Sequence, residues 1–227
     1  MSPTVDAVDT VTVDSYGTLV DPSAVERTLA AHVDDPEPIS NRWRSRSIRY
    51  TMVGNYTDTY QPFYDMNRHA LVYALASHGV ELSEETIEDV LSTYHSLDVF
   101  PDVRAGLERI TGAGYDVYVV SNGNPAMLES MVESAEIGDV IEDTISAHEI
   151  RTFKPAPEIY RHAAARTGTP IDRIVHVAGP TFDVQGAMNA GMQGAWLNRG
   201  GAPWDGFAAD PDLTIESFHA LADELGT

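Results

Sequence analysis

Val11-Thr-Val-Asp14-Ser-Tyr-Gly17-Thr-Leu19 is the stretch from which the architecture of this chain is most directly inferred. Its β-branched residues predict a short strand, and Gly17 permits a tight turn directly after it. A carboxylate, Asp14, follows the strand at once. On local grounds alone Asp14 could be a turn residue whose side chain bonds the nearby backbone. The rest of the chain has to decide between that interpretation and a functional one.

After Pro101 the sequence alternates between short apolar runs and helical segments. Asp102 is expected to cap a helix that runs to Ile110, and Asn124-Pro125 is expected to cap the next one. Such alternation implies a parallel sheet with helices on both faces. The further segments expected are strands at 115–120, 144–147, 173–177 and 194–197, and helices at 157–167 and 182–189.

Residues 22–97 differ in character from the parts that flank them, because they combine helical periodicity with many aromatic residues. Ser83 is expected to begin one helix, with acids favourably placed in its first turn. This helical stretch separates the first strand from the alternating series. We therefore expect an α/β fold with a Rossmann-like core of parallel sheet and flanking helices. The core would comprise residues 1–21 and 98–227, and an inserted α-helical cap would comprise residues 22–97.

The composition is strongly acidic, with 35 Asp and Glu against 14 Lys and Arg and a net charge of −21. This charge argues against nucleic acid or an anionic membrane as a partner. Acids spread along the whole chain are typical of adaptation to molar salt, where the Debye length falls to about 3 Å. There is no cysteine, no secretory signal and no apolar run near the ~20 residues of a membrane span. We expect a soluble, cytoplasmic protein.

Lys154 is the only lysine, and every other positively charged side chain is an arginine. It could have survived by chance on the surface, but an ammonium suits a tight site where arginine does not fit. In a parallel sheet, ligands bind outside the carboxyl ends of the strands. Asp14, Ser121, Asn122 and Asp183 also follow predicted strands. We therefore expect these side chains to meet Lys154 at one edge of the sheet.

The chain resembles the haloacid dehalogenase superfamily and, within it, the L-2-haloacid dehalogenases. The resemblance covers nearly the whole chain and rests on several motifs in a fixed order. These motifs are Asp14-Ser-Tyr-Gly-Thr-Leu19, Trp43-Arg44, Val120-Ser121-Asn122-Gly123, Lys154-Pro155 with Tyr160, and Phe182-Asp183.

The resemblance implies hydrolysis of short (S)-2-haloacids to (R)-2-hydroxyacids plus halide. Asp14 would be the nucleophile and would form an ester intermediate, while Thr18 holds its carboxylate. Lys154 would keep Asp14 ionised beside the anionic substrate. Asp183 would orient Lys154 or help to activate the hydrolytic water, although a plain helix cap is the alternative. The family also implies a homodimer, a small halogenated carboxylic acid as the substrate, and no cofactor.

Further binding residues follow from the same resemblance. Ser121 and nearby backbone donors would bind the substrate carboxylate, and Asn122 would help to cradle the halide, although both could simply cap a loop. Arg44 would supply the main halide contact from the cap, unless it belongs to a solvated basic helix face. The remaining candidates are the hydrogen-bonding or core residue Tyr160 and the apolar walls Phe63 and Phe182.

Tyr16 separates two branches of the superfamily. Phosphatases carry a second aspartate two residues after the nucleophile as a general acid, which Tyr16 cannot replace, whereas a departing halide needs no proton. They also bind Mg²⁺ with more than one acid around the fourth motif. Here Ala178-Gly-Pro-Thr-Phe-Asp183 supplies one acid, so we expect no obligatory metal.

Two alternatives remain from the sequence. One is a Mg²⁺-dependent phosphatase of the same fold. The other is a binding module with a relic site, because characterised dehalogenases carry a serine and an asparagine where this chain has Ala178 and Pro180. Loss of these two side-chain donors would affect the positioning of water and substrate, and Thr181 could substitute for them.

Overall fold

A parallel β-sheet forms the centre of the molecule in the computed structural model, which describes residues 8–207 and 209–227. The described strands pair side by side in the order β3-β2-β1-β4-β5-β6, and every pairing is parallel. Their bounds are β1 (Thr10–Val13), β2 (Asp116–Ser121), β3 (Asp143–Ser146), β4 (Ile174–Ala178), β5 (Gln193–Leu197) and β6 (Leu213–Ile215).

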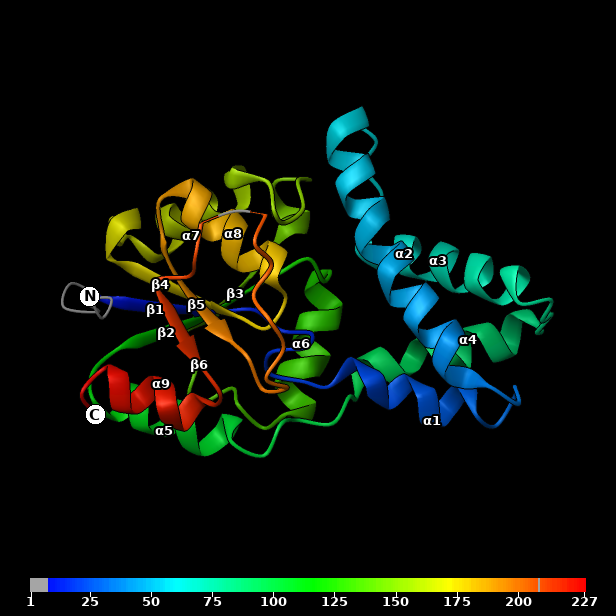
Figure 1. Ribbon diagram of the computed structural model, residues 1–227, viewed down its shortest axis with the longest axis horizontal. Helices are drawn as coiled ribbons and strands as arrows, with labels where there is room; N and C mark the ends of the chain where they lie inside the picture. Colours follow the sequence, from blue (N-terminus) through cyan, green and yellow to red (C-terminus); the bar gives the residue numbers. More distant parts are fainter. Residues whose placement is uncertain (1–7, 208) are drawn as a thin grey trace.

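Helices cover both faces of this sheet (Figure 1). The helices α7 and α8 lie on one face, and α5 and α9 lie on the other. In the described ranges the helices are α1 (Val25–Leu29), α2 (Pro36–Thr57), α3 (Phe63–Ser77), α4 (Glu84–Ser92), α5 (Val103–Gly112), α6 (Pro125–Ser134), α7 (Pro157–Thr167), α8 (Thr181–Ala190) and α9 (Phe218–Glu224). None of these helices is long and apolar enough to cross a membrane.

The predicted α/β fold is confirmed. Strands β1 and β4 are buried along their whole length, as expected for parallel strands covered on both faces. Because Val13 pairs with Val177, Asp14 lies beside the end of β4, where its backbone N–H donates to the Val177 oxygen at 2.9 Å. Strand β1 thus delivers Asp14 to the carboxyl edge of the sheet.

Between β1 and α5 the described chain contains helices and turns and no strand of the sheet. Helices α1 to α4 stand beside one end of the sheet (Figure 1). Polar contacts join the long α2 to α3: the indole Nε1 of Trp43 donates to the backbone oxygen of Asn67 at 2.8 Å, and Ser47 Oγ donates to Asn67 Oδ1 at 2.7 Å. These contacts fix the position of α2, and therefore of Arg44, relative to α3.

Two expected helix caps are wrong in their detail. Asp102 precedes α5, but its carboxylate accepts no hydrogen bond from that helix; it accepts the N–H of Phe218 at 2.7 Å and pairs with Arg199 at 2.5 Å. Asn124 precedes α6, but its Oδ1 accepts the N–H of Tyr64 at 3.0 Å. In both cases the side chain binds a donor that is distant in the sequence. Ser83, in contrast, caps α4 as predicted.

Candidate active site

The carboxylate of Asp14 is held in the turn that follows β1. Thr18 donates its hydroxyl to Asp14 Oδ2 at 2.8 Å and accepts the N–H of Gly179 at 2.9 Å. A side chain at Gly179 would bring its Cβ to 2.4 Å from the Gly17 oxygen, so the close approach of the two loops requires glycine there. The ends of β1 and β4 are thus joined around the aspartate, which is only 7% exposed.

Lys154 lies in the loop before α7 and is 1% exposed. Its backbone N–H donates to Asn122 Oδ1 at 2.9 Å. Its ammonium Nζ lies 3.0 Å from Asp14 Oδ1 and 2.7 Å from Asp183 Oδ2. The interpretation of Lys154 as a chance surface residue is therefore wrong, because its charge lies buried between two carboxylates.

The charged groups in this cluster shift one another's pKa values. Burial alone would lower the pKa of Lys154, but Asp14 and Asp183 outweigh it and raise that pKa above its usual value. Burial would raise the pKa of Asp183, but Lys154 and then His176 hold it well below its usual range. For Asp14, burial and the neighbouring Asp183 prevail over Lys154 and Thr18, and the pKa is raised. Asp14 is therefore the more basic of the two carboxylates.

Asp183, in the first turn of α8, is fixed by side chains from α7 and β4. The hydroxyl of Tyr160 donates to Asp183 Oδ1 at 2.6 Å, and burial raises the pKa of this tyrosine well above its usual value. Nε2 of His176 lies 3.1 Å from the same oxygen. Asp183 is 1% exposed and its carboxylate contacts the site, so a role as a simple helix cap does not describe it.

The residues after β2 shape the neighbouring loop. Ser121 Oγ accepts the N–H of Gly123 at 3.0 Å and lies 2.6 Å from Ser15 Oγ. Asn122 is 8% exposed, and its amide oxygen accepts the hydrogen bond from the backbone N–H of Lys154. Both residues therefore make the loop-capping contacts that the sequence left open, and that of Asn122 is made to Lys154 itself.

An apolar cavity of about 210 Å³ lies between the sheet edge and the helices that follow β1. It is lined from both sides, chiefly by Tyr16, Arg44, Phe63, Asn67, Tyr94 and Phe182. The hydroxyl of Tyr16 and the amide nitrogen of Asn67 are buried and have no hydrogen-bond partner among the described residues. The guanidinium of Arg44 bonds Asn41 Oδ1 at 2.8 Å. The cavity can thus enclose a small, mainly apolar molecule and offer it a few donors.

The two departures noted in the sequence lie at this edge of the sheet. Ala178 is fully buried at the end of β4, and Pro180 precedes α8 and lines the cavity. Neither side chain can donate a hydrogen bond. Thr181, the first residue of α8, is the nearest hydroxyl-bearing residue in this segment.

Three contributors to the site could not be singled out from the sequence. Thr12 and His176 lie within the buried strands β1 and β4, and Ser15 lies two residues after β1. Their contacts depend on strand pairing that no local pattern reveals. The only available signal was a polar residue, His176, inside the otherwise apolar run Ile174–Ala178.

The chain belongs to the haloacid dehalogenase-like hydrolase family, whose model matches residues 8–191. Within this family it falls into the L-2-haloacid dehalogenase branch. It is 31% identical over 200 residues to (S)-2-haloacid dehalogenase 4A of Burkholderia cepacia, covering 88% of this chain and 87% of that protein. It is 29% identical over 219 residues to (S)-2-haloacid dehalogenase H-109 of Pseudomonas putida, covering 96% and 98%.

A solved structure extends the comparison to the fold. The L-2-haloacid dehalogenase of Xanthobacter autotrophicus with chloropropionic acid covalently bound matches with a TM-score of 0.89 at 27% identity, covering 96% of this chain and 98% of that one.

Proposed function

We propose that this protein is an (S)-2-haloacid dehalogenase, which converts short (S)-2-haloacids to (R)-2-hydroxyacids and halide. The single observation that carries the proposal is the buried ammonium of Lys154 between Asp14 and Asp183, beside an apolar cavity. The names of the similar proteins from Burkholderia cepacia and Pseudomonas putida point to the same reaction.

In the first step an oxygen of Asp14 attacks C2 of the substrate from the side opposite the halogen. A C–O bond forms, the C–halogen bond breaks, and the halide leaves with the bonding electrons, so the centre is inverted. The near-complete burial of Asp14 strips water from the nucleophile, while Lys154 and Thr18 hold its two oxygens in place. Arg44, which lines the cavity, would receive the halide.

In the second step water attacks the carbonyl carbon of the ester on Asp14. The bond between this carbonyl carbon and the ester oxygen breaks, the carboxylate of Asp14 is restored, and the ester oxygen leaves as the hydroxyl of the product. The bond between C2 and that oxygen never breaks, so the inverted centre is not inverted again. Asp183 would orient or deprotonate this water, with Tyr160 fixing the carboxylate of Asp183. Lys154 would stabilise the negative charge that develops on the carbonyl oxygen.

The other predicted residues have roles in binding within this proposal. Ser121 and backbone donors beside it would hold the substrate carboxylate, and Asn122 would contact the halide. Phe63, Phe182 and Tyr16 would enclose the halogen-bearing carbon in the cavity. Because a hydrolytic displacement of halide by carboxylate needs neither an electron carrier nor a leaving-group proton, the proposed reaction uses no cofactor.

The proposal divides the chain as the sequence suggests: residues 1–21 and 98–227 form the catalytic core, and residues 22–97 form the cap. The placement of Arg44 and Phe63 on α2 and α3 supports this division, because both reach the cavity from outside the sheet. A homodimer in the cytoplasm, adapted to high salt, completes the proposal. The family resemblance supports the dimer, the net charge of −21 supports the salt adaptation, and a chain without cysteine needs no oxidising compartment.

Release of halide from (S)-2-chloropropionate in concentrated KCl tests the proposal, with release of phosphate from a phosphate monoester measured in parallel. We expect halide from the (S) enantiomer, unchanged by a chelator, and none from Asp14→Asn. Chelator-sensitive phosphate release without halide release would support the phosphatase alternative instead. Halide release that persists in Asp14→Asn would refute the role given to the nucleophile.

A further inference from the structure

His176 is a buried titratable residue that the proposed mechanism leaves without a role. It lies in the middle of β4 and is fully buried. Its Nδ1 is 2.9 Å from Thr12 Oγ1, and its Nε2 is 3.1 Å from Asp183 Oδ1. The imidazole therefore reaches the carboxylate that shares Lys154 with the nucleophile.

The contacts of the two ring nitrogens are compatible with a proton on each of them. Nε2 faces a carboxylate oxygen, where a lone pair would be repelled, so this nitrogen carries a hydrogen. Its contact with Asp183 is not an aligned hydrogen bond, and it becomes an ion pair when both ring nitrogens are protonated. Thr12 can donate its hydroxyl to the Val175 oxygen at 3.4 Å and then accepts a hydrogen from Nδ1. With both nitrogens protonated the ring is an imidazolium.

The balance of buried charge favours this state over the neutral ring. Two carboxylates, Asp14 and Asp183, share the one ammonium of Lys154, which leaves one negative charge uncompensated in a buried site. Burying an unpaired charge is costly, and a carboxylic acid substrate would add a second negative charge. The other titratable group against the ring is Tyr160, whose ring centroid lies 5.5 Å away and whose raised pKa keeps it neutral. An imidazolium at His176 makes the unliganded cluster neutral.

We propose that His176 is a positioning residue that is held as an imidazolium against Asp183 and provides the second buried positive charge of the site. By balancing Asp183, it leaves Lys154 available to Asp14 and to the substrate carboxylate. The catalytic meaning of this charge rests on the proposed function, but the charge state itself does not.

Nitrogen NMR of the histidine side chains in the full-length protein tests the charge state directly. The His176 signal is assigned by its loss in His176→Gln and, should that variant not fold, in His176→Asn. We expect both ring nitrogens of His176 to remain protonated at neutral pH. A neutral ring with one protonated nitrogen under the same conditions would overturn the proposal.

Kinetics of His176→Gln test the consequence for catalysis. Loss of the positive charge should raise KM for (S)-2-chloropropionate about tenfold and change kcat less, because an anion then meets an uncompensated charge. It should also move the acid limb of the pH profile of kcat/KM to higher pH by about one unit, because the ionised form of Asp14 loses a stabilising positive charge. A purely structural role would leave the position of this limb unchanged.

His162→Gln is the matched control, because His162 pairs with Glu149 away from the site and lies partly exposed. It should leave both KM and the acid limb unchanged. If His176→Gln folds and behaves like this control, the inference is wrong. If the wild-type protein releases no halide at all, the proposed function fails, and the NMR measurement still decides the charge of His176.

Discussion

At the scale of single residues, the site depends on a buried lysine whose ammonium is shared between two carboxylates. The ammonium of Lys154 lies within 3.0 Å of one carboxylate and 2.7 Å of another, and the side chain is 1% exposed. A guanidinium is larger and planar and presents its donors in a rigid fork. It therefore cannot replace the ammonium without moving Asp14 or Asp183.

Lys154→Arg is expected to lower kcat/KM for (S)-2-chloropropionate by about 10³-fold, because the transition state loses a preorganised positive charge. The initial rate of halide release measures the effect, and circular dichroism shows whether the variant folds. Arg161→Lys, an exchange of a cation on the exposed side of α7, serves as the control. A folded Lys154→Arg enzyme with wild-type activity would contradict the role of the ammonium.

The pH dependence of the reaction depends on Asp14. Its pKa is raised above that of an ordinary aspartate, and it must be ionised to attack, so kcat/KM should fall as the pH drops through this raised pKa. The hydrogen bond from Thr18 favours the charged form and opposes the rise. Thr18→Val should therefore move the acid limb of the profile to higher pH, by about one unit. A limb that stays in place or moves to lower pH would show that Thr18 does not stabilise the carboxylate.

The meeting of Asp14, Lys154 and Asp183 could be predicted from the sequence, because each follows a strand end and parallel strands bring their carboxyl ends to one edge. The contact between His176 and Asp183 could not. It depends on which face of β4 His176 occupies and on the register of β4 against β1, and neither is visible in the run Ile174–Ala178.

At the scale of elements, the long helix α2 holds the loop that carries Lys154. The side chain of Asn55, near the end of α2, donates to the Phe153 oxygen at 2.6 Å and accepts the Phe153 N–H at 2.9 Å. The ring of Tyr60 stacks on Phe153 with the ring centroids 5.5 Å apart. The residue before Lys154 is thus fixed by the segment that follows β1.

Asn55→Ala should destabilise the fold by about 1–3 kcal/mol, because two backbone groups lose their partners, and it should also lower kcat by loosening Lys154. Urea unfolding and halide release measure the two effects. Asn189→Ala, at an exposed position of α8, is the matched control and should change neither. Equal behaviour of the two variants would show that the contact with Phe153 does not position the loop.

The alternating pattern predicted the strands of the second half to within a residue or two, because apolar runs between turn residues leave little choice. Strand β6 and helix α9 escaped prediction, since three residues at Leu213–Ile215 are too few to show a period. The side chains of Asp102 and Asn124 were wrongly predicted to cap their own helices. Local sequence places these residues before a helix, but it contains no information about the distant N–H groups that they bind.

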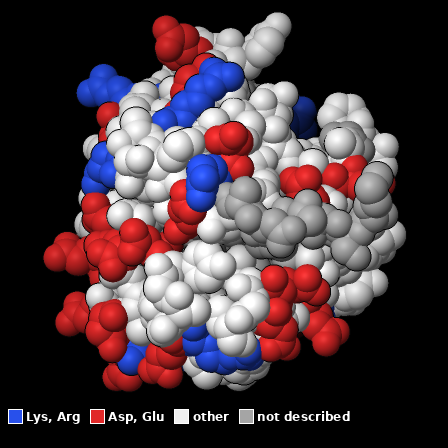
Figure 2. Space-filling model, turned by 90° about the vertical axis from the view of Figure 1, so that its left-hand side faces the viewer, with Lys and Arg blue, Asp and Glu red and all other residues white. Residues whose placement is uncertain are grey.

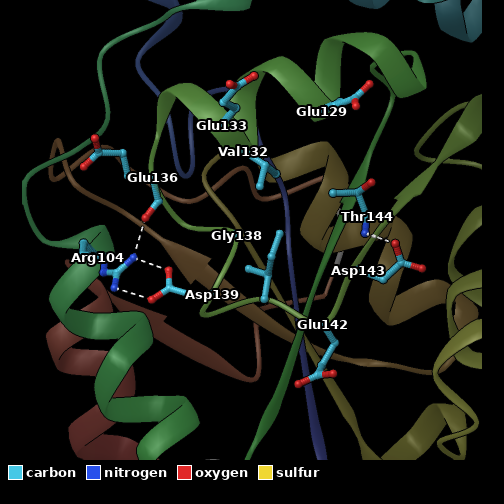
Figure 3. Close-up of a pocket in the computed structure, with 11 residues that line it drawn as sticks. Arg104, Glu129, Val132, Glu133, Glu136, Gly138, Asp139, Glu142, Asp143 and Thr144 are labelled. Carbon is cyan, nitrogen blue, oxygen red and sulfur yellow. Dashed lines mark hydrogen bonds and ion pairs between the residues drawn. The ribbon is translucent and has the colours of Figure 1, made fainter.

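At the scale of the whole molecule, acidic side chains dominate the surface. Figure 2 shows them in clusters over one face, with fewer basic side chains between them. Figure 3 shows a pocket beside α6 in which the side chain of Arg104 pairs with that of Asp139, whereas those of Glu129, Glu133 and Glu142 point away from Arg104. Repulsion among such unpaired acids opposes folding at low ionic strength and is screened by salt.

The temperature of unfolding should therefore rise as KCl increases from about 0.1 M to about 2 M, over which the Debye length falls from about 10 Å to below 3 Å. Thermal unfolding followed by circular dichroism measures this trend. The triple variant Glu129→Gln, Glu133→Gln, Glu142→Gln should show a weaker salt dependence, because it removes three of the repelling charges. A midpoint that falls with added KCl would contradict the proposed adaptation to salt.

The ester on Asp14 is the central claim, and a single turnover in isotopically labelled water tests it most directly. With enzyme in excess over (S)-2-chloropropionate, water attacks the carbonyl carbon of the ester, so heavy oxygen should enter the peptide that contains Asp14. The hydroxyl of the first (R)-lactate released should then be unlabelled, because its oxygen comes from the aspartate. Mass spectrometry of the peptide and of the lactate measures the heavy-oxygen content of each. Heavy oxygen in the first product, with Asp14 unlabelled, would mean that water attacks the substrate directly and would contradict the account.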